Sequence, residues 1–478
     1  MSALADPLPT KTKLLYGFGS IAYGIKDSGF ATFLLFYYNQ VVGMRADLVS
    51  LAIALALFVD AFIDPLIGQW TDRTRTQIGR RHPWLYASAI PICVSWLLLW
   101  HPPQASEMMQ FFYLLSLAIM VRISLSLNEV PGLALLPELT KDYDDRTSIL
   151  RYRFLFGWGG GLTMMALAYA VFLAPTDAYP NGLLNPEGYS TYAIIGAFIM
   201  AFAVLIAARS THTRIVKAYR ETKHLPAASE SLMHIFATFR FRPFMLLMLA
   251  GTFAFANQGL VFALTPYLLT HIWLFEQTQL FIYAISIFAG VILTFLLING
   301  ISRRFGKSKT AAVLTLVSMV LSTLPYWLRM IGMFPSPGSP VLLPLILVFI
   351  IFATAAAVGV MICTMSMMAD VTDAYEYETK KKSEGVFSSG MWFMQKAVGG
   401  LGILFAGIII SIIQLPDKAP PGSVDIVVVD NLALIFASMT VIIGLIGAWA
   451  YTLFPLSQQD HIERIAKLAS AQGVVKTR

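Results

Sequence analysis

The chain has 478 residues, of which 57% are hydrophobic and only 13% are charged. Soluble domains carry about 25% charged residues, so this chain has about half of the charge that a water-facing surface needs. The composition therefore excludes a soluble globular enzyme and indicates an integral membrane protein. The formal net charge of +7 comes mainly from basic residues in short connections. There it orients the chain in the bilayer and points to no nucleic-acid partner.

Apolar stretches long enough to cross a bilayer follow one another along the chain. They form two sets of six, at 14–40, 48–71, 83–101, 109–137, 150–174 and 189–208, and at 241–271, 278–300, 308–332, 340–369, 385–414 and 431–455. The longest polar interval separates the two sets. The sequence therefore predicts twelve transmembrane helices in an all-α fold, with an N-terminal six-helix bundle over 1–209, a cytoplasmic linker over 210–240 and a C-terminal six-helix bundle with a short cytoplasmic tail over 241–478.

Lysine and arginine concentrate in the predicted loops of one side of the membrane, at 73–81, 141–146, 303–309 and 380–382, and in the central linker. Cytoplasmic connections carry the excess of basic residues in membrane proteins. We therefore expect both termini to be cytoplasmic. The first thirteen residues, MSALADPLPTKTK, lack the pattern of a removable signal peptide.

Ionisable side chains interrupt several of the apolar stretches. A charge at bilayer depth costs at least about 2.5 to 3.5 kcal/mol, so each one needs a partner or a water-filled cavity. Four acids and four bases can neutralise one another across an interior cavity when no ligand is bound. They are Lys26, Asp27, Asp60, Asp64, Arg122, Glu129, Arg153 and Lys396.

Asp60 and Asp64 form the sharpest pattern among these charges. Residues four apart share one face of a helix, and two carboxylates held together repel each other until a positive ion joins them. Na⁺, Li⁺ or H⁺ would serve, with Asp27 and a nearby hydroxyl as further oxygen ligands for a metal ion. The alternative is that both acids only pair with Lys26 or Lys396 and fasten helices, and the two interpretations are compatible.

Arg122 and Glu129 stand seven residues apart, so two helical turns bring them to one face of the fourth span. They form either a buried bridge or a polar grip on a hydroxylated substrate, with Arg153 as a second donor. In the eleventh span, Trp392 precedes Lys396 by four residues, which places an indole beside an ammonium group. An aromatic face can stack on a sugar ring, but tryptophan in a membrane helix is also a common packing or interface residue.

Two groups of charges mark the cytoplasmic ends of the predicted spans. Gly68, Asp72 and Arg73 lead into a basic turn that resembles the loop between helices two and three of the major facilitator superfamily. Their carboxylate and guanidinium groups can lock helix ends together and act in gating. Asp370 and Asp373 precede a lysine run, and the simplest prediction is that they bridge to Lys380, Lys381 or Lys382. Small residues in the fifth span, Gly157 and Gly159 to Gly161, indicate close helix packing.

Four segments in order along nearly the whole chain, together with a lysine, resemble the glycoside-pentoside-hexuronide:cation symporter family of the major facilitator superfamily. They are YGFGSIAYGIKD, DAFIDPLIGQWTDRTRTQIGRRHPW, EVPGLALLPELTKDYDDRTSILRYR, MMADVTDAYEYETKKKSEGVFSSGMWFMQK and the lysine that ends the last of them. The resemblance implies that the cation-binding acids are Asp27, Asp60 and Asp64. It also places the family's sugar-ligating fourth-helix acid on Glu129, its fifth-helix arginine on Arg153 and its eleventh-helix lysine on Lys396.

The substrate-binding group that we expect comprises Glu129, Arg153, Lys396, Trp392, Lys26 and Arg122. The positions at which this sequence departs from the family pattern lie in the substrate-binding part of the protein. Leu133 and Met361 stand where the melibiose carrier, the best-known member, has tryptophans. A stacking platform for a galactoside is therefore missing, whereas the cation site is intact.

The resemblance implies a secondary active transporter of the cell inner membrane that couples Na⁺ or H⁺ to a sugar, a glycoside or a related polar organic solute by alternating access. The alternative is a cation-coupled carrier of a lysophospholipid or another amphiphile. The sequence contains no P-loop, no His-Glu-x-x-His and no Gly-x-Ser-x-Gly motif. We therefore expect no enzyme activity and no cofactor beyond the coupling cation. We also expect the protein to work as a monomer in the lipid bilayer.

Overall fold

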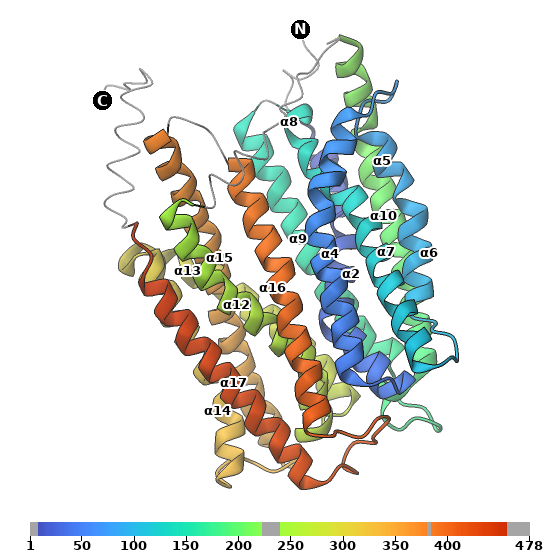
Figure 1. Ribbon diagram of the computed structural model, residues 1–478, viewed down its shortest axis with the longest axis vertical. Coiled ribbons are helices and arrows are strands. Elements are labelled where there is room, and N and C mark those ends of the chain that lie inside the picture. Colours follow the sequence, from blue (N-terminus) through green and yellow to red (C-terminus); the bar gives the residue numbers. More distant parts are fainter. Residues whose placement is uncertain (1–7, 141, 222–239, 380–383, 457–478) are drawn as a thin grey trace. The chain divides into compact units, whose positions relative to one another are not determined.

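The computed structural model describes residues 8–140, 142–221, 240–379 and 384–456, and these residues form helices and connections without β-strands (Figure 1). Eleven of the helical stretches are long and apolar enough to cross a membrane. The prediction of an all-helical membrane protein is confirmed. The stretches are built from α4 (Ala46–Arg73), α5 (His82–Ala87) with α6 (Ala89–Leu99), α7 (Glu107–Ala134), α9 (Tyr143–Leu167), α10 (Pro186–Glu221), α12 (Arg242–Tyr267), α13 (Gln277–Phe305), α14 (Lys307–Met330), α15 (Leu342–Thr379), α16 (Glu384–Ile412) and α17 (Ile426–Thr452).

The predicted first span is helical, but it is divided into short pieces. It runs through α1 (Thr10–Phe18), α2 (Ile21–Ser28), the π-helical turn η1 (Gly29–Phe33), α3 (Leu34–Phe36) and a second π-helical turn, η2 (Tyr37–Val42). Wider π turns interrupt α-helices and are frequent at functional sites. Because of these interruptions, the first of the twelve predicted spans is not a single uninterrupted helix.

The chain forms two compact units. The first comprises residues 1–228, 262–284 and 403–425, and the second comprises 229–261, 285–402 and 426–478. Two stretches from the predicted C-terminal bundle therefore pack within the first unit. Helix α10 extends to Glu221, so the predicted linker begins as a continuation of the sixth span, and residues 222–239 of that linker lie outside the described residues.

An aromatic cluster holds the first span in place within the first unit. The Trp100 ring stacks on Tyr189 with centroids 5.8 Å apart, and the Tyr37 hydroxyl donates a hydrogen bond of 2.8 Å to the Trp100 carbonyl. Tyr38 donates in the same way to the Leu99 carbonyl over 2.7 Å. These contacts fasten η2 to α6 and α10, so the charged residues earlier in the same span are carried on an anchored segment.

Helices α2 and α9 approach each other backbone to backbone. A Cβ atom at Gly24 would overlap the carbonyl oxygen of Gly157, and one at Gly161 would lie 2.6 Å from the carbonyl oxygen of Gly24. At Gly160 a Cβ would meet the Ile21 side chain at 3.0 Å. The prediction of close helix packing is confirmed at these positions, but it is wrong at Gly159, which has open space around it.

We expect Gly24→Ala to destabilise the protein, because the added methyl group must push α2 away from α9. Overpacking of this kind costs about 1 to 3 kcal/mol or more. Gly159→Ala is the matched control on the same pair of helices, since its methyl group meets no other atom within 4 Å. The measurement is thermal unfolding of both variants in detergent. Equal unfolding temperatures for the two variants would contradict the close contact.

Candidate cation and substrate sites

Helix α4 brings Asp60 and Asp64 to the face that packs on α7. The Ser126 hydroxyl of α7 lies 2.6 Å from Asp64 Oδ1 and 3.1 Å from Asp60 Oδ1. The two carboxylates, four residues apart, are therefore bridged by one side chain, as the helical spacing predicts. Ser126 is the neighbouring hydroxyl that the sequence could not single out.

Arg122 completes this group from one helical turn earlier on α7. Its Nη1 lies 3.1 Å from Asp60 Oδ2, and the two side chains are only 3% and 2% exposed. The guanidinium also lies over the Phe30 ring, 4.6 Å from its centroid. Of the two alternatives for Arg122 and Glu129, the bridge between them is not formed among the described residues, because Arg122 pairs with Asp60. Arg122 and Ser126 are four residues apart on α7, so both reach the acids of α4 instead.

Lys26 and Asp27 sit beside each other near the end of α2 but face different surroundings. The Lys26 ammonium lies 3.5 Å from Asp27 Oδ1 and over the Tyr23 ring at 4.2 Å. The Lys26 side chain is 5% exposed, whereas that of Asp27 is 58% exposed. Lys26 is therefore the buried member of this pair, and Asp27 is the member that a bound ion can reach.

Glu129 pairs with Arg153 across α7 and α9. Arg153 Nη2 donates a hydrogen bond of 2.6 Å to Glu129 Oε1. The Arg153 side chain is 8% exposed and that of Glu129 is 28% exposed. The Tyr16 hydroxyl donates to the Gly132 carbonyl, and the Arg153 guanidinium lies 5.4 Å from the Tyr16 ring centroid. Glu129 is thus held by a buried arginine and still presents a surface that can accept hydrogen bonds from a bound hydroxyl group.

Trp392 and Lys396 lie on α16 within the second unit, and both are half-buried. Their convergence with Glu129 and Arg153 of the first unit stays a prediction. Asp370 of α15 lies in the second unit too, and the Lys307 ammonium donates to both of its carboxylate oxygens over 2.7 Å. The observed ion pair of Asp370 is thus with Lys307. The predicted partners, Lys380, Lys381 and Lys382, lie outside the described residues, and Asp373 follows Asp370 on α15.

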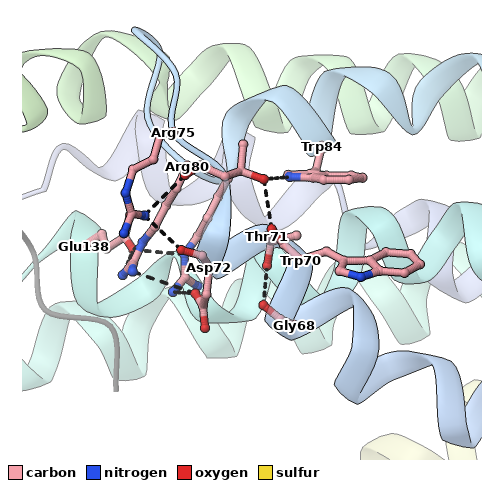
Figure 2. Close-up of polar contacts among 10 residues, drawn as sticks. Gly68, Trp70, Thr71, Asp72, Arg75, Arg80, Trp84 and Glu138 are labelled. Carbon is pink, nitrogen blue, oxygen red and sulfur yellow. Dashed lines mark hydrogen bonds and ion pairs between the residues drawn. The ribbon is translucent and has the colours of Figure 1, made fainter. Parts of the chain in front are cut away.

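The basic turn after α4 folds into an ion-pair network. Figure 2 shows Arg80 reaching Glu138 of α8 (Leu136–Leu139), with Nε 2.8 Å and Nη2 2.6 Å from Oε1. Arg81 Nε lies 2.9 Å from the same oxygen, and its Nη2 lies 3.3 Å from Asp72 Oδ1. Burial lowers the pKa of Arg81 from its ordinary value, and the Glu138 carboxylate opposes this shift. Asp72 therefore takes part in a lock between helix ends, and its role in gating stays a prediction.

The residues of this lock differ in part from those expected. Arg73 is exposed, and the two arginines that pair with Asp72 are Arg80 and Arg81. Glu138, the acid that joins both of them, was missed by the sequence reasoning. Its only signal was a charged residue after a proline in a short apolar turn, LPEL.

The MFS/sugar transport protein family model matches residues 15–458 of this chain. The chain belongs to this family. An uncharacterized symporter of Synechocystis, sll1374, is 33% identical over 172 residues, which is 35% of this chain and 32% of that protein. The isoprimeverose transporter of Lactiplantibacillus pentosus is 25% identical over 84% of this chain and 80% of its own length.

The fold agrees with that membership. The xylose transporter XylE from E. coli, solved in an inward open conformation, is similar with a TM-score of 0.63 and 12% identity, over 96% of this chain and 99% of XylE. As a member of the MFS/sugar transport protein family, the protein is a multi-pass membrane transporter. The prediction that it is not an enzyme is confirmed by the family.

Proposed function

We propose that this protein imports a sugar, a glycoside or a related polar organic solute together with a cation. The observation that carries the proposal is the pair of charged groups within the first unit. One is the Asp60, Asp64, Ser126 and Arg122 group, and the other is the Glu129–Arg153 pair. Isolated charges at bilayer depth are expensive, and those that remain in transporters mark ion and substrate pathways.

The first group takes the cation. Asp60 and Asp64 supply carboxylate oxygens and Ser126 a hydroxyl oxygen, while Asp27 is the exposed carboxylate on the adjacent first span. Arg122, which sequence reasoning assigned to the substrate, belongs with the cation group because its ion pair is to Asp60. The coupling cation is Na⁺ or H⁺.

The second group takes the substrate. Glu129 accepts hydrogen bonds from hydroxyl groups, and Arg153 orients it from the buried side. Lys26, Trp392 and Lys396 stay in the proposed substrate-binding group, as the family resemblance implies for the lysine of α16. The similarity to relatives such as the isoprimeverose transporter favours a glycoside over the amphiphilic alternative.

Coupling follows from differential affinity. A cation that binds better to the state in which Glu129 can hold the substrate raises the affinity for that substrate, and the substrate raises the affinity for the cation by the same factor. Asp72, with Arg73 at the same helix end, and Asp370, with Asp373 on α15, act at the cytoplasmic gates. We place the transporter in the inner membrane as a monomer with both termini cytoplasmic.

The direct test uses purified protein in proteoliposomes. A panel of sugars, glycosides and lysolipids is first screened by thermal shift, and each stabilising compound is then tested for uptake driven by an inward cation gradient. Uphill accumulation of a sugar or glycoside is the expected result. Accumulation of a lysolipid alone would replace the substrate class, and no accumulation under any cation gradient would remove the symport proposal.

Glu129→Gln and Arg153→Ala are expected to weaken substrate binding more than tenfold while leaving cation binding within a few fold. The loss of a charged partner from a site built to bind hydroxyl groups costs about 1.5 to 3 kcal/mol for each hydrogen bond. The measurement is calorimetric titration with the stabilising sugar, with cation binding followed in parallel. A larger effect on the cation than on the sugar would reassign both residues to the cation site.

A further inference from the structure

Arg122 introduces a permanent positive charge into the group that the proposed function assigns to the cation. Guanidinium groups stay protonated in proteins, so this charge cannot be removed by a change of pH. Both side chains of the Arg122–Asp60 pair are almost completely buried, and Phe30 covers the guanidinium. The positive charge is therefore a fixed component of the site and no surface feature.

The same arginine uses an oxygen that a metal ion would need. Asp60 Oδ2 is 3.1 Å from Arg122 Nη1, and Asp60 Oδ1 is 3.1 Å from the Ser126 hydroxyl. Hard cations take several oxygen ligands at about 2.4 Å, and Asp60 and Asp64 are the anionic ligands that this group offers. Because the Arg122 guanidinium already donates to Asp60 Oδ2, a metal ion at this oxygen competes with the arginine.

Charge repulsion adds to this competition. A monovalent cation bound to Asp60 Oδ2 at about 2.4 Å would lie within about 5 to 6 Å of Arg122 Nη1. At an effective dielectric constant of about 20, two like charges at that distance weaken binding by a factor of about 100.

We propose that Arg122 is the residue that determines cation specificity, and that it excludes Na⁺ and Li⁺ from the Asp60–Asp64 site by occupying the position of the metal ion at Asp60. This inference rests on the proposed function, because it names the ions that the symporter does not use. A proton gradient is then the cation gradient that drives accumulation.

The first measurement needs no substrate and uses Na⁺ and Li⁺ themselves as probes. Thermal unfolding and calorimetry of the wild-type protein are recorded in NaCl or LiCl against choline chloride at equal ionic strength. The expected result is no specific binding up to about 100 mM, so the unfolding temperature stays constant within error. Saturable binding of either ion to the wild-type protein at millimolar concentration would overturn the proposal.

The second measurement uses Arg122→Gln, which keeps a hydrogen-bond donor for Asp60 but removes the charge. We expect this variant to gain Na⁺ affinity by about 100-fold, seen as a Na⁺-dependent rise of its unfolding temperature. Arg329→Gln is the control. Arg329 pairs with Asp430 in the second unit, so this substitution removes the same charge from an ion pair elsewhere in the protein. A folded Arg122→Gln protein without Na⁺ affinity would contradict the assignment. Should the variant not fold, the wild-type titration decides.

Transport separates this inference from the function on which it rests. Proteoliposomes with wild-type protein are loaded to give either an inward H⁺ gradient or an inward Na⁺ gradient, and uptake of a sugar that stabilises the protein is followed. Uphill uptake under the H⁺ gradient alone supports both the symport proposal and the role of Arg122. Uphill uptake under the Na⁺ gradient alone overturns the role of Arg122 and leaves the symport intact. Uptake that is never uphill removes the symport proposal itself.

Discussion

Asp64→Asn is expected to abolish cation-driven accumulation while the protein still folds. Asp64 is half-buried, and its Oδ1 lies 2.6 Å from the Ser126 hydroxyl. Asparagine has nearly the same shape and its amide oxygen can still accept that hydrogen bond, so the change removes the negative charge with little loss of packing. Without the charge, the site no longer responds to a cation, and the free energy of the cation gradient is no longer transmitted to the substrate.

The measurement compares uphill uptake with exchange of labelled for unlabelled sugar across proteoliposomes. We expect Asp64→Asn to lose the uphill component by at least tenfold and to keep exchange, since exchange needs substrate binding and rocking but no net coupling. Unchanged uphill uptake would remove Asp64 from the cation site. Asp60→Asn is a less selective variant, because it leaves Arg122 buried without its carboxylate, which costs about 3 to 5 kcal/mol.

Glu138→Ala is expected to lower stability by about 3 to 5 kcal/mol, the cost of removing one partner from a buried ion pair. Its Oε1 accepts from Arg80 and lies 2.9 Å from Arg81 Nε, and both guanidinium groups are less than 10% exposed. In the Glu138→Ala variant, Asp72 remains as the carboxylate beside the buried side chains of Arg80 and Arg81 (Figure 2). Thermal unfolding and proteolysis of the loop over residues 74–81 report the loss.

Arg75→Ala is the control for this network. Arg75 is exposed and donates to backbone carbonyls of Asp72 and Thr74 over 3.0 and 3.4 Å. Exposed contacts of this kind contribute little to stability, so we expect a change within about 0.5 kcal/mol. If Glu138→Ala and Arg75→Ala unfold at the same temperature, the carboxylate does not hold the loop to α8.

The sequence predicted those parts of the site that depend on spacing within one helix. Four residues between Asp60 and Asp64 place both on one face of α4, and the structure joins them through one hydroxyl. The membrane class followed from composition, since apolar area in excess of what a core can hold must face lipid. Asp72 lies in an ion-pair network at the end of α4, in the charged turn that the sequence singled out, and its role in gating stays a prediction.

The parts that failed depend on which helices are neighbours. The spacing of Arg122 and Glu129 places them on one face of α7, but each pairs with a residue of another helix. Arg122 pairs with Asp60 of α4, and Glu129 pairs with Arg153 of α9. Spacing within one segment carries no information about how α4, α7 and α9 are arranged around each other. The same holds for Ser126, because a serine in an apolar helix is ordinary until an acid is found beside it.

The glycine contact between α2 and α9 has a consequence for how a signal travels between the two binding groups. Asp27 stands one turn after Gly24, and Arg153 stands one turn before Gly157. Because the backbones of α2 and α9 are in direct contact at these glycines, a change of side-chain rotamer cannot compensate for a small displacement of either helix. If Asp27 and Arg153 have the roles proposed above, a shift of Asp27 reaches the Arg153 guanidinium as a rigid translation of the two helices, without a relay of rearranging side chains.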